Sequence, residues 1–571
     1  MNRVASDPSV KHHSRPNRQT SAFSRVRQKL AASWYRCYIG HRSEYSVERL
    51  LAFRDYYKRT SIFRAISICA LTPLPSLLTA LAIDCVPIRP PSDGWKANYA
   101  VWIRLLLAMS CASMGIVLQV KGAIESGIIS IVGGVKIALG TAICSVFTMI
   151  LAAIWKFPTP FGYILIIGPY VLFFAIFTAL AVGPNVLFRS PALREQLKTQ
   201  LVIIINQGIV VGCYAVFSAV FNRLSGTQQA AFVFVMPMIK FVTKQNIVNT
   251  AESYYEYVAP LVVFSVDLFN MYYAAICMQT SKSWITTVII MTADTFHLVG
   301  AVRAIFGRSK IMTNKVETSV VQQPETYLDE LPRILQNMLK EMEGPSPTTV
   351  ATIRILVPFP LPLSDESKLF LTELLKTNGT KSNHRRSKKC SKVGGETPTS
   401  GTMPTKAMLT QISPEILTTT FTGESRLGTK KRANAQVVQE ALKTLFHSEY
   451  VMLSEYIEFV VPMLYAPYLA AIFHLPVAAY YPHTASMTTT ELHSAISNIF
   501  LYAIIEFMIF AVLLVILKRK FGFSPLYQLA FVLETHAPAL QGHLFVWTIT
   551  ILHLTLAHYG VDFNILTNGT F

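Results

Sequence analysis

The segment that decides the fold class runs from Tyr450 to Pro482 and reads YVMLSEYIEFVVPMLYAPYLAAIFHLPVAAYYP. It begins as an amphipathic stretch that carries two carboxylates, Glu455 and Glu458, three residues apart. It continues as an apolar run, broken by Pro462 and Pro467. About 20 apolar residues in a helix are enough to cross a bilayer. We therefore predict a membrane-spanning helix here.

A short sequence similar to part of this segment lies about 200 residues upstream. Glu256–Pro260 reads EYVAP and Glu458–Pro462 reads EFVVP, and each opens a hydrophobic span. The long hydrophilic insert at 307–448 lies between them. This order predicts two transmembrane blocks separated by a water-exposed loop.

The composition of the whole chain agrees with a membrane protein. Of its 571 residues, 52% are hydrophobic and only 15% are charged, whereas soluble proteins are about 25% charged. Residues 1–60 hold 13 Lys and Arg against 4 Asp and Glu, and residues 307–448 hold 20 against 13, so these two parts carry +16 of the net +19. Basic excess of this kind marks the cytoplasmic face of membrane proteins. Nucleic-acid binding could also use it, but the hydrophobic body disfavours that partner.

Ten segments are apolar and long enough to span. They are 62–83, 99–120, 128–154, 160–187, 200–222, 258–279, 284–306, 457–479, 497–517 and 542–559. If the two basic parts lie on the same side, the number of crossings before 307 must be even. We therefore count the shorter segment 230–242 as an eighth crossing in that block. The prediction is an all-α polytopic transmembrane helical bundle of about 10–11 crossings with a long, largely disordered cytosolic loop.

The domain organisation follows from these spans. We expect a disordered basic segment at 1–30, transmembrane blocks at 61–306 and 449–560, a disordered linker at 376–432 within the loop 307–448, and a tail at 561–571. Two interpretations fit 31–60: an interfacial helix near anionic lipid headgroups, or a cytosolic helix packed on the membrane domain. The linker is a solvated tether or a site for anionic lipid or a regulatory partner. Residues 521–537 are expected to form an interfacial or re-entrant helix.

The first residues contain no apolar segment of the kind found in signal peptides, so we expect no cleaved signal peptide. The predicted orientation places the amino terminus and the loop in the cytosol and the carboxyl terminus outside, where Asn568 begins a glycosylation sequon. Plasma membrane and internal membranes both fit this orientation.

The sequence holds none of the motifs that identify common catalytic or cofactor sites. Nucleotide-binding glycine loops, the GxSxG and HExxH motifs and paired metal-ligand spacings are all absent from it. We therefore predict no catalytic residues, no cofactor and no metal ligands. An enzyme acting on lipid would need a nucleophile or metal cluster at the interface, and the sequence provides none that we can assemble.

What the sequence does offer is ionisable and amide side chains within apolar spans. Charged groups at bilayer depth are costly, so they face protein or water and are candidates for function. The candidate intramembrane polar site consists of Asp267, Asn270, Asp294, His297, Glu455, Glu458 and Glu506. Several of them are three residues apart and therefore share a helix face.

Structural interpretations compete with this site. Arg104 could extend to the membrane surface, and Asp267 could form an ion pair with Lys136. Glu455 and Glu458 could be ordinary groups at the interface. The leading functional hypothesis is a transporter or channel for an unknown solute or ion, in contact with the lipid bilayer. The alternative is a scaffold or receptor that acts through its basic amino terminus and loop.

Several sequence runs carry a resemblance to known proteins. They are Ser33-Trp-Tyr35, Glu44-Tyr-Ser-Val-Glu-Arg49, Thr72-Pro-Leu-Pro75, Gly94-Trp95 with Trp102-Ile-Arg104, and RKFGFSPLYQLAFVLE at 519–534. Together they resemble a large group of multi-pass membrane proteins from oomycetes. The resemblance covers the membrane parts and skips 376–432. It implies the fold class and a membrane location, and it implies no activity.

Overall fold

The computed structural model describes residues 43–124, 128–221, 223–251, 256–280, 284–316, 327–340, 349–357, 361–375, 418–422 and 426–560. Helices dominate these ranges. The strands described are β1 (Thr349–Arg354) and β2 (Thr418–Thr422), which pair antiparallel. The predicted segments 1–30 and 561–571 lie outside the described residues.

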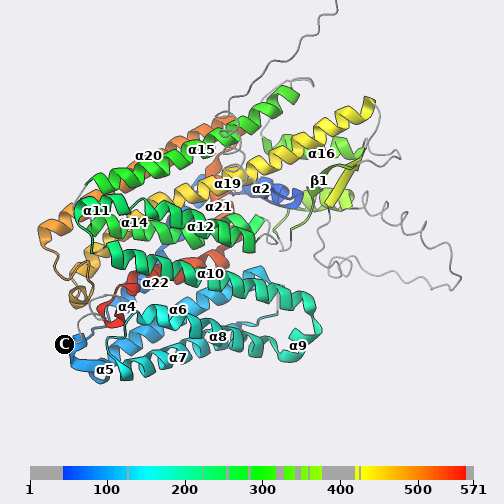
Figure 1. Cartoon of the computed structure of the whole chain (residues 1–571). Coiled ribbons are helices and arrows are strands. Elements are labelled where there is room, and N and C mark those ends of the chain that lie inside the picture. The colour runs from blue at the N-terminus through cyan, green and yellow to red at the C-terminus, as the bar shows by residue number, and fades with distance from the viewer. Residues whose placement is uncertain are drawn as a thin grey trace, which may run out of the picture.

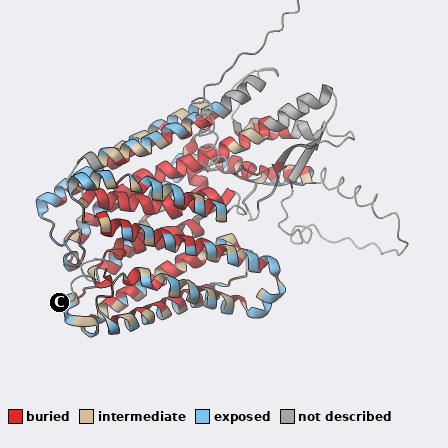
Figure 2. Cartoon of the chain, in the orientation of Figure 1, coloured by how far each residue is buried: buried red, intermediate tan, exposed pale blue. Residues whose placement is uncertain are grey.

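Nine helical segments among the described residues are long and apolar enough to cross a membrane. They are α3 (Ile62–Leu71) with α4 (Leu74–Asp84), α6 (Tyr99–Ala123), α7 (Ile131–Trp155), α8 (Gly162–Val182), α10 (Pro191–Phe221), α13 (Val258–Val262) with η4 (Val263–Asp267) and α14 (Leu268–Thr280), α15 (Trp284–Val316), α19 (Arg426–Phe473) and α20 (Thr489–Phe521). Large apolar side chains are exposed on their outer faces, for example Phe63, Phe147 and Leu180 (Figure 2). Such faces contact lipid, so the predicted multi-pass helical membrane protein is confirmed.

The bundle has two ends, which we name by the elements found there. The loop end holds α2 (Val47–Arg59), α16 (Tyr327–Lys340), β1 and β2 (Figure 1). The distal end holds α5 (Gly94–Ala97), η5 (Pro476–Tyr480) and η6 (Ala557–Tyr559).

Two shorter helical segments also connect these ends. The segment α11 (Gly226–Phe232) with α12 (Val235–Thr250) begins at the distal end in Figure 1. The chain after it reaches the loop end, where Glu256 bonds Arg354 of β1. Helix α22 (Ala537–Leu554) starts beside α2, where His536 lies 3.2 Å from Arg49. Counting both, the described residues pass between the two ends eleven times, eight of them before residue 307; which of these passes cross the membrane stays a prediction for the two shorter segments.

The core of the bundle is built around α22 and the segment α13–α14, which are almost wholly buried (Figure 2). Helices α6 and α22 approach backbone to backbone at Gly115 and Gly542. A Cβ atom added to Gly115 would lie 2.5 Å from the carbonyl oxygen of Gly542. Only glycine permits this contact, and it fixes α22 in the centre of the bundle.

The loop end is a packed structure on top of the bundle. Helix α2 is buried along most of its length, and its Phe53 packs on Phe523 and Phe531 with ring centroids 5.3 and 5.5 Å apart. Protein therefore covers most of α2, as the packed-helix interpretation of 31–60 expects. Its position relative to the membrane interface stays a prediction. Helix α21 (Pro525–Thr535) packs against α2 and α3 and does not cross.

Helix α19 joins the loop end to the bundle without a break. At 1.5 Å per residue its 48 residues extend about 72 Å, more than twice the hydrocarbon thickness. Its first residues, from Arg426, and strand β2 fall inside the predicted disordered linker 376–432. The threonine-rich run 418–422 within it pairs with β1, and the extent of the linker stays a prediction. Residues 376–417 lie outside the described part.

Candidate functional site

Seven charged side chains from five segments of the bundle meet inside it, and we call them the carboxylate cluster. They are Lys240 and Lys244 of α12, Asp267 of η4, Asp294 of α15, Glu455 and Glu458 of α19, and Glu506 of α20.

Lys240 lies between carboxylates from three helical segments. Its Nζ atom is 3.2 Å from Glu458 Oε1 and 3.5 Å from an oxygen of both Asp267 and Asp294. The side chain of Lys240 is 13% exposed. One ammonium group of α12 therefore links η4, α15 and α19 electrostatically.

Lys244 lies one helical turn further along α12 and has its own partners. Its Nζ atom is 2.6 Å from Asp267 Oδ1 and donates to the Tyr450 hydroxyl at 2.8 Å. Ser454 donates to the other oxygen of Asp267 at 3.2 Å. Asp267 is therefore held from two sides, by α12 and by α19.

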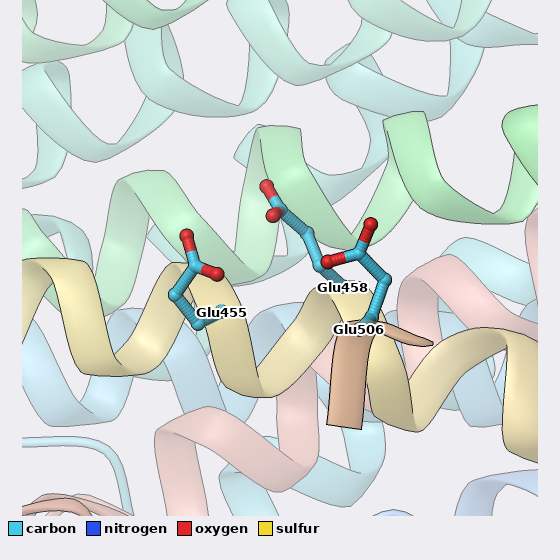
Figure 3. A group of neighbouring side chains, drawn as sticks. All are labelled: Glu455, Glu458 and Glu506. Carbon is cyan, nitrogen blue, oxygen red and sulfur yellow. The ribbon is translucent and has the colours of Figure 1, made fainter. Parts of the chain in front are cut away.

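Three glutamates form the other half of the cluster. One carboxylate oxygen from each of Glu455, Glu458 and Glu506 lies within 4.8 Å of the other two. Figure 3 shows Glu455 and Glu458 on one side of α19, with Glu506 reaching across from α20. All three are at most 4% exposed, and Oε1 of Glu506 has no hydrogen-bond partner among the described residues.

The cluster lies deep in the bundle. Glu506 is 17 residues from the start of α20 and 15 from its end. At 1.5 Å per residue these spacings are about 26 and 23 Å, so Glu506 sits far from both water-exposed ends. Charged groups at this depth need compensation within the protein.

Asp267 ends a local break in its helix. Residues Val263–Asp267 form a π-helical turn between α13 and α14, and all five are buried. A π turn inserts a residue into the helical repeat and often occurs at functional sites. Here it separates the face of Ser265, which accepts from Gln207 at 3.0 Å, from that of Asp267. No sequence signal beyond Pro260 announces it.

The predicted site residues largely come together. Asp267, Asp294, Glu455, Glu458 and Glu506 are in the cluster, and His297 follows Asp294 by three residues on α15. Asn270 is the exception, because its side-chain oxygen accepts from the Tyr214 hydroxyl at 2.7 Å.

The two lysines are what sequence reasoning missed. Their spacing of four residues was the available signal, since it places both on one helix face.

Several structural interpretations are wrong. Lys136 is exposed on α7 and does not pair with Asp267. Arg104 does not extend to the surface, because it is 2% exposed and pairs with Asp84. Glu455 and Glu458 are covered by neighbouring helices, at 4% and 3% exposed. Glu256 instead lies at the loop end, so the two Glu-x-Val-x-Pro elements do not form equivalent sites.

Asp84 shows what a balanced buried charge looks like in this protein. Its carboxylate pairs with Arg104, accepts from the hydroxyls of Tyr468 and Tyr481 at 2.8 and 2.9 Å, and lies 3.4 Å from His553. One negative charge thus has one full positive charge and two hydroxyl donors. We call this group the Asp84 network.

The carboxylate cluster is not balanced in this way. Five carboxylates face two lysines, so the formal charge is −3 when all are ionised, and a protonated His297 would reduce it only to −2. Burying uncompensated charge is very costly, and such groups take up protons or bind cations instead. The cluster can therefore bind or exchange positive charge.

An apolar cavity lies elsewhere, between α6, α8, α10 and α22. Its lining includes Tyr163, Tyr170, Gln207 and Trp547 and none of the cluster residues. The cavity is therefore separate from the charged groups.

Comparisons with known proteins add no family to this geometry. No protein-family model, curated protein or solved structure matches the chain.

Proposed function

We propose that this protein is a cation-coupled membrane transporter whose coupling site is the carboxylate cluster. The observation that carries the proposal is the surplus of three carboxylates over lysines at mid-depth of the bundle. A cluster with surplus negative charge is stable only with protons or another cation bound. Uptake and release of that cation would then be linked to the conformation of the helices around it.

The contrast with the Asp84 network supports a functional role. A purely structural buried charge is expected to be paired and hydrogen-bonded, because an unpaired one destabilises the fold. Both carboxylate oxygens of Asp84 accept hydrogen bonds, whereas Oε1 of Glu506 has no partner among the described residues. Stability alone does not favour the carboxylate surplus.

The position of the cluster also supports transport. Its members come from α12, η4 and α15 of the first block and from α19 and α20 of the second. Transporters commonly place their sites between two halves, beside an interrupted helix, so that relative movement exposes the site to each side in turn. The π turn at Asp267 is a milder irregularity, because the helix continues through it.

Transport is tested with purified protein in liposomes. An imposed proton or cation gradient should drive a flux that Glu458→Gln and Asp267→Asn each reduce about ten-fold or more, because each removes a charge that contacts Lys240. Glu195→Gln is the matched control, since its side chain is 70% exposed at the start of α10. If both cluster variants keep every measurable flux of the wild type, transport through this cluster is rejected.

We further propose that the loop end faces the cytosol, as the basic residues predict. Cys85 is exposed at the distal end, directly after α4. A membrane-impermeant maleimide added to intact cells that carry the protein in the plasma membrane should label it, and Cys85→Ser should lose that label. Labelling only after permeabilisation would reverse the orientation.

A further inference from the structure

We propose that Glu455, Glu458 and Glu506 form a binding site for a hard divalent cation of the Ca²⁺ or Mn²⁺ class. The inference rests on the proposed function, because it names the ion that the cluster takes up. It commits to a metal ion where the proposed function allows a proton.

The spacing of the oxygens fits such an ion. Three atoms that lie within 4.8 Å of one another all lie within about 2.8 Å of a common centre. Ca²⁺ binds oxygen at about 2.3–2.6 Å, so movements of a few tenths of an ångström complete the contacts. Glu455, Glu458 and Glu506 are 4%, 3% and 2% exposed. They come from two adjacent helices, which hold them in place.

The donor type selects the class of metal. All three ligands are carboxylates, with no thiolate or imidazole among them. Carboxylate oxygens suit Ca²⁺, Mn²⁺ and Mg²⁺, whereas sulfur and imidazole favour zinc and copper. Mg²⁺ prefers shorter contacts of about 2.0–2.1 Å and gives up its water reluctantly, so a site built only from protein carboxylates favours the larger ions.

One observation independent of the acidic composition points to a missing ligand. Oε1 of Glu506 is buried and has no hydrogen-bond partner in the described ranges. Buried polar atoms are nearly always partnered. In Figure 3 the Glu506 carboxylate lies beside that of Glu458, within the same group of oxygens.

The charge balance favours a divalent ion over a monovalent one. Binding M²⁺ changes the formal charge of the cluster from −3 to −1, and a monovalent ion leaves −2. Lys240, 3.2 Å from Glu458, supplies the opposing positive charge. It would keep Glu458 paired when the ion leaves.

The test is Mn²⁺ binding to the purified full-length protein in detergent, stripped of metal with a chelator. Electron paramagnetic resonance of free Mn²⁺ should show one saturable site per chain, and Ca²⁺ should displace the bound ion. Glu506→Gln and Glu455→Gln should each weaken binding about ten-fold or more, because each removes a charged ligand. Glu195→Gln, the exposed control, should bind like the wild type. Size-exclusion chromatography checks that each variant is folded.

The outcomes separate this inference from the proposed function. Absence of saturable Mn²⁺ binding, or unchanged affinity in both folded glutamate variants, overturns the metal site. A proton-driven flux without metal binding would overturn it while leaving transport intact. Specific Mn²⁺ binding without any flux would support the site and count against transport.

Discussion

Replacing Glu506 by glutamine should make the metal-free protein more stable. The substitution keeps the size of the side chain and removes one of five buried negative charges in the carboxylate cluster. Because only two lysines oppose these charges, repulsion among the carboxylates destabilises the folded wild type, and the variant has less of this repulsion. The same change at Asp84 should have the opposite sign, so the pair of variants tests the charge balance directly.

The size of the effect follows from the spacing. Two carboxylate charges no more than 4.8 Å apart repel by at least about 3.5 kcal/mol at an effective dielectric constant of 20. Proton uptake limits this repulsion, because protonating an ordinary glutamate at pH 7 costs about 3.7 kcal/mol. We therefore expect Glu506→Gln to raise the free energy of unfolding by about 1–3 kcal/mol. In a chain of this length that is about 1–3 °C in Tm.

Asp84→Asn removes a charge that is needed. It leaves Arg104 buried without its counter-charge and weakens the bonds from Tyr468 and Tyr481. Breaking a buried pair by removing one partner costs about 3–5 kcal/mol. Asp84→Asn should therefore lower Tm by several degrees.

The assay is thermal unfolding in one detergent with excess chelator, followed by tryptophan fluorescence and by loss of the monodisperse peak in size-exclusion chromatography. Opposite shifts of the two variants support the charge count. If Glu506→Gln lowers Tm as Asp84→Asn does, the Glu506 charge is compensated, and the reasoning from surplus charge is refuted.

Three further predictions concern the loop end and the core. Arg49→Met should lower the free energy of unfolding by about 3–5 kcal/mol, because Arg49 donates to both oxygens of buried Glu449 at 2.8 and 2.9 Å. Adding Glu449→Gln should recover part of this loss in a double-mutant cycle. If the effects of the two substitutions simply add, this pairing is contradicted. Burial raises the pKa of Glu48 to about 7, although a backbone hydrogen bond lowers it. Its stabilising effect is therefore complete below about pH 4.5 and lost as pH rises through about 7. The protection factors of the α2 amides, corrected for the intrinsic exchange rate, should fall across that range, and Glu48→Gln should remove that part of the fall. Gly542→Ala should destabilise the α6–α22 contact by about 1–3 kcal/mol. The control Gly212→Ala should not lower Tm, because no atom lies within 4 Å of the added Cβ. Equal Tm values of the two variants would mean that the close approach of α6 and α22 is not needed.

The membrane class and most of the spans could be predicted from the sequence because both are local properties. A segment either holds about 20 apolar residues or it does not, and the parity of the crossings follows from where the basic residues lie. The same logic found five of the seven members of the carboxylate cluster, since a carboxylate within an apolar run must be buried in protein or face water. The resemblance to oomycete proteins and the orientation in the membrane stay predictions.

The partners of these charges were decided by the tertiary structure alone. Lys240 and Glu458 are 218 residues apart, and Arg49 and Glu449 are 400 apart. Which of them meet depends on how each helix is rotated and packed, as Asp267 shows by pairing with Lys240 and Lys244 rather than Lys136. The hydropathy of a segment indicates that a charged side chain within it needs a partner of opposite charge or water. It does not indicate the direction in which the helix presents that side chain, so it cannot identify the partner.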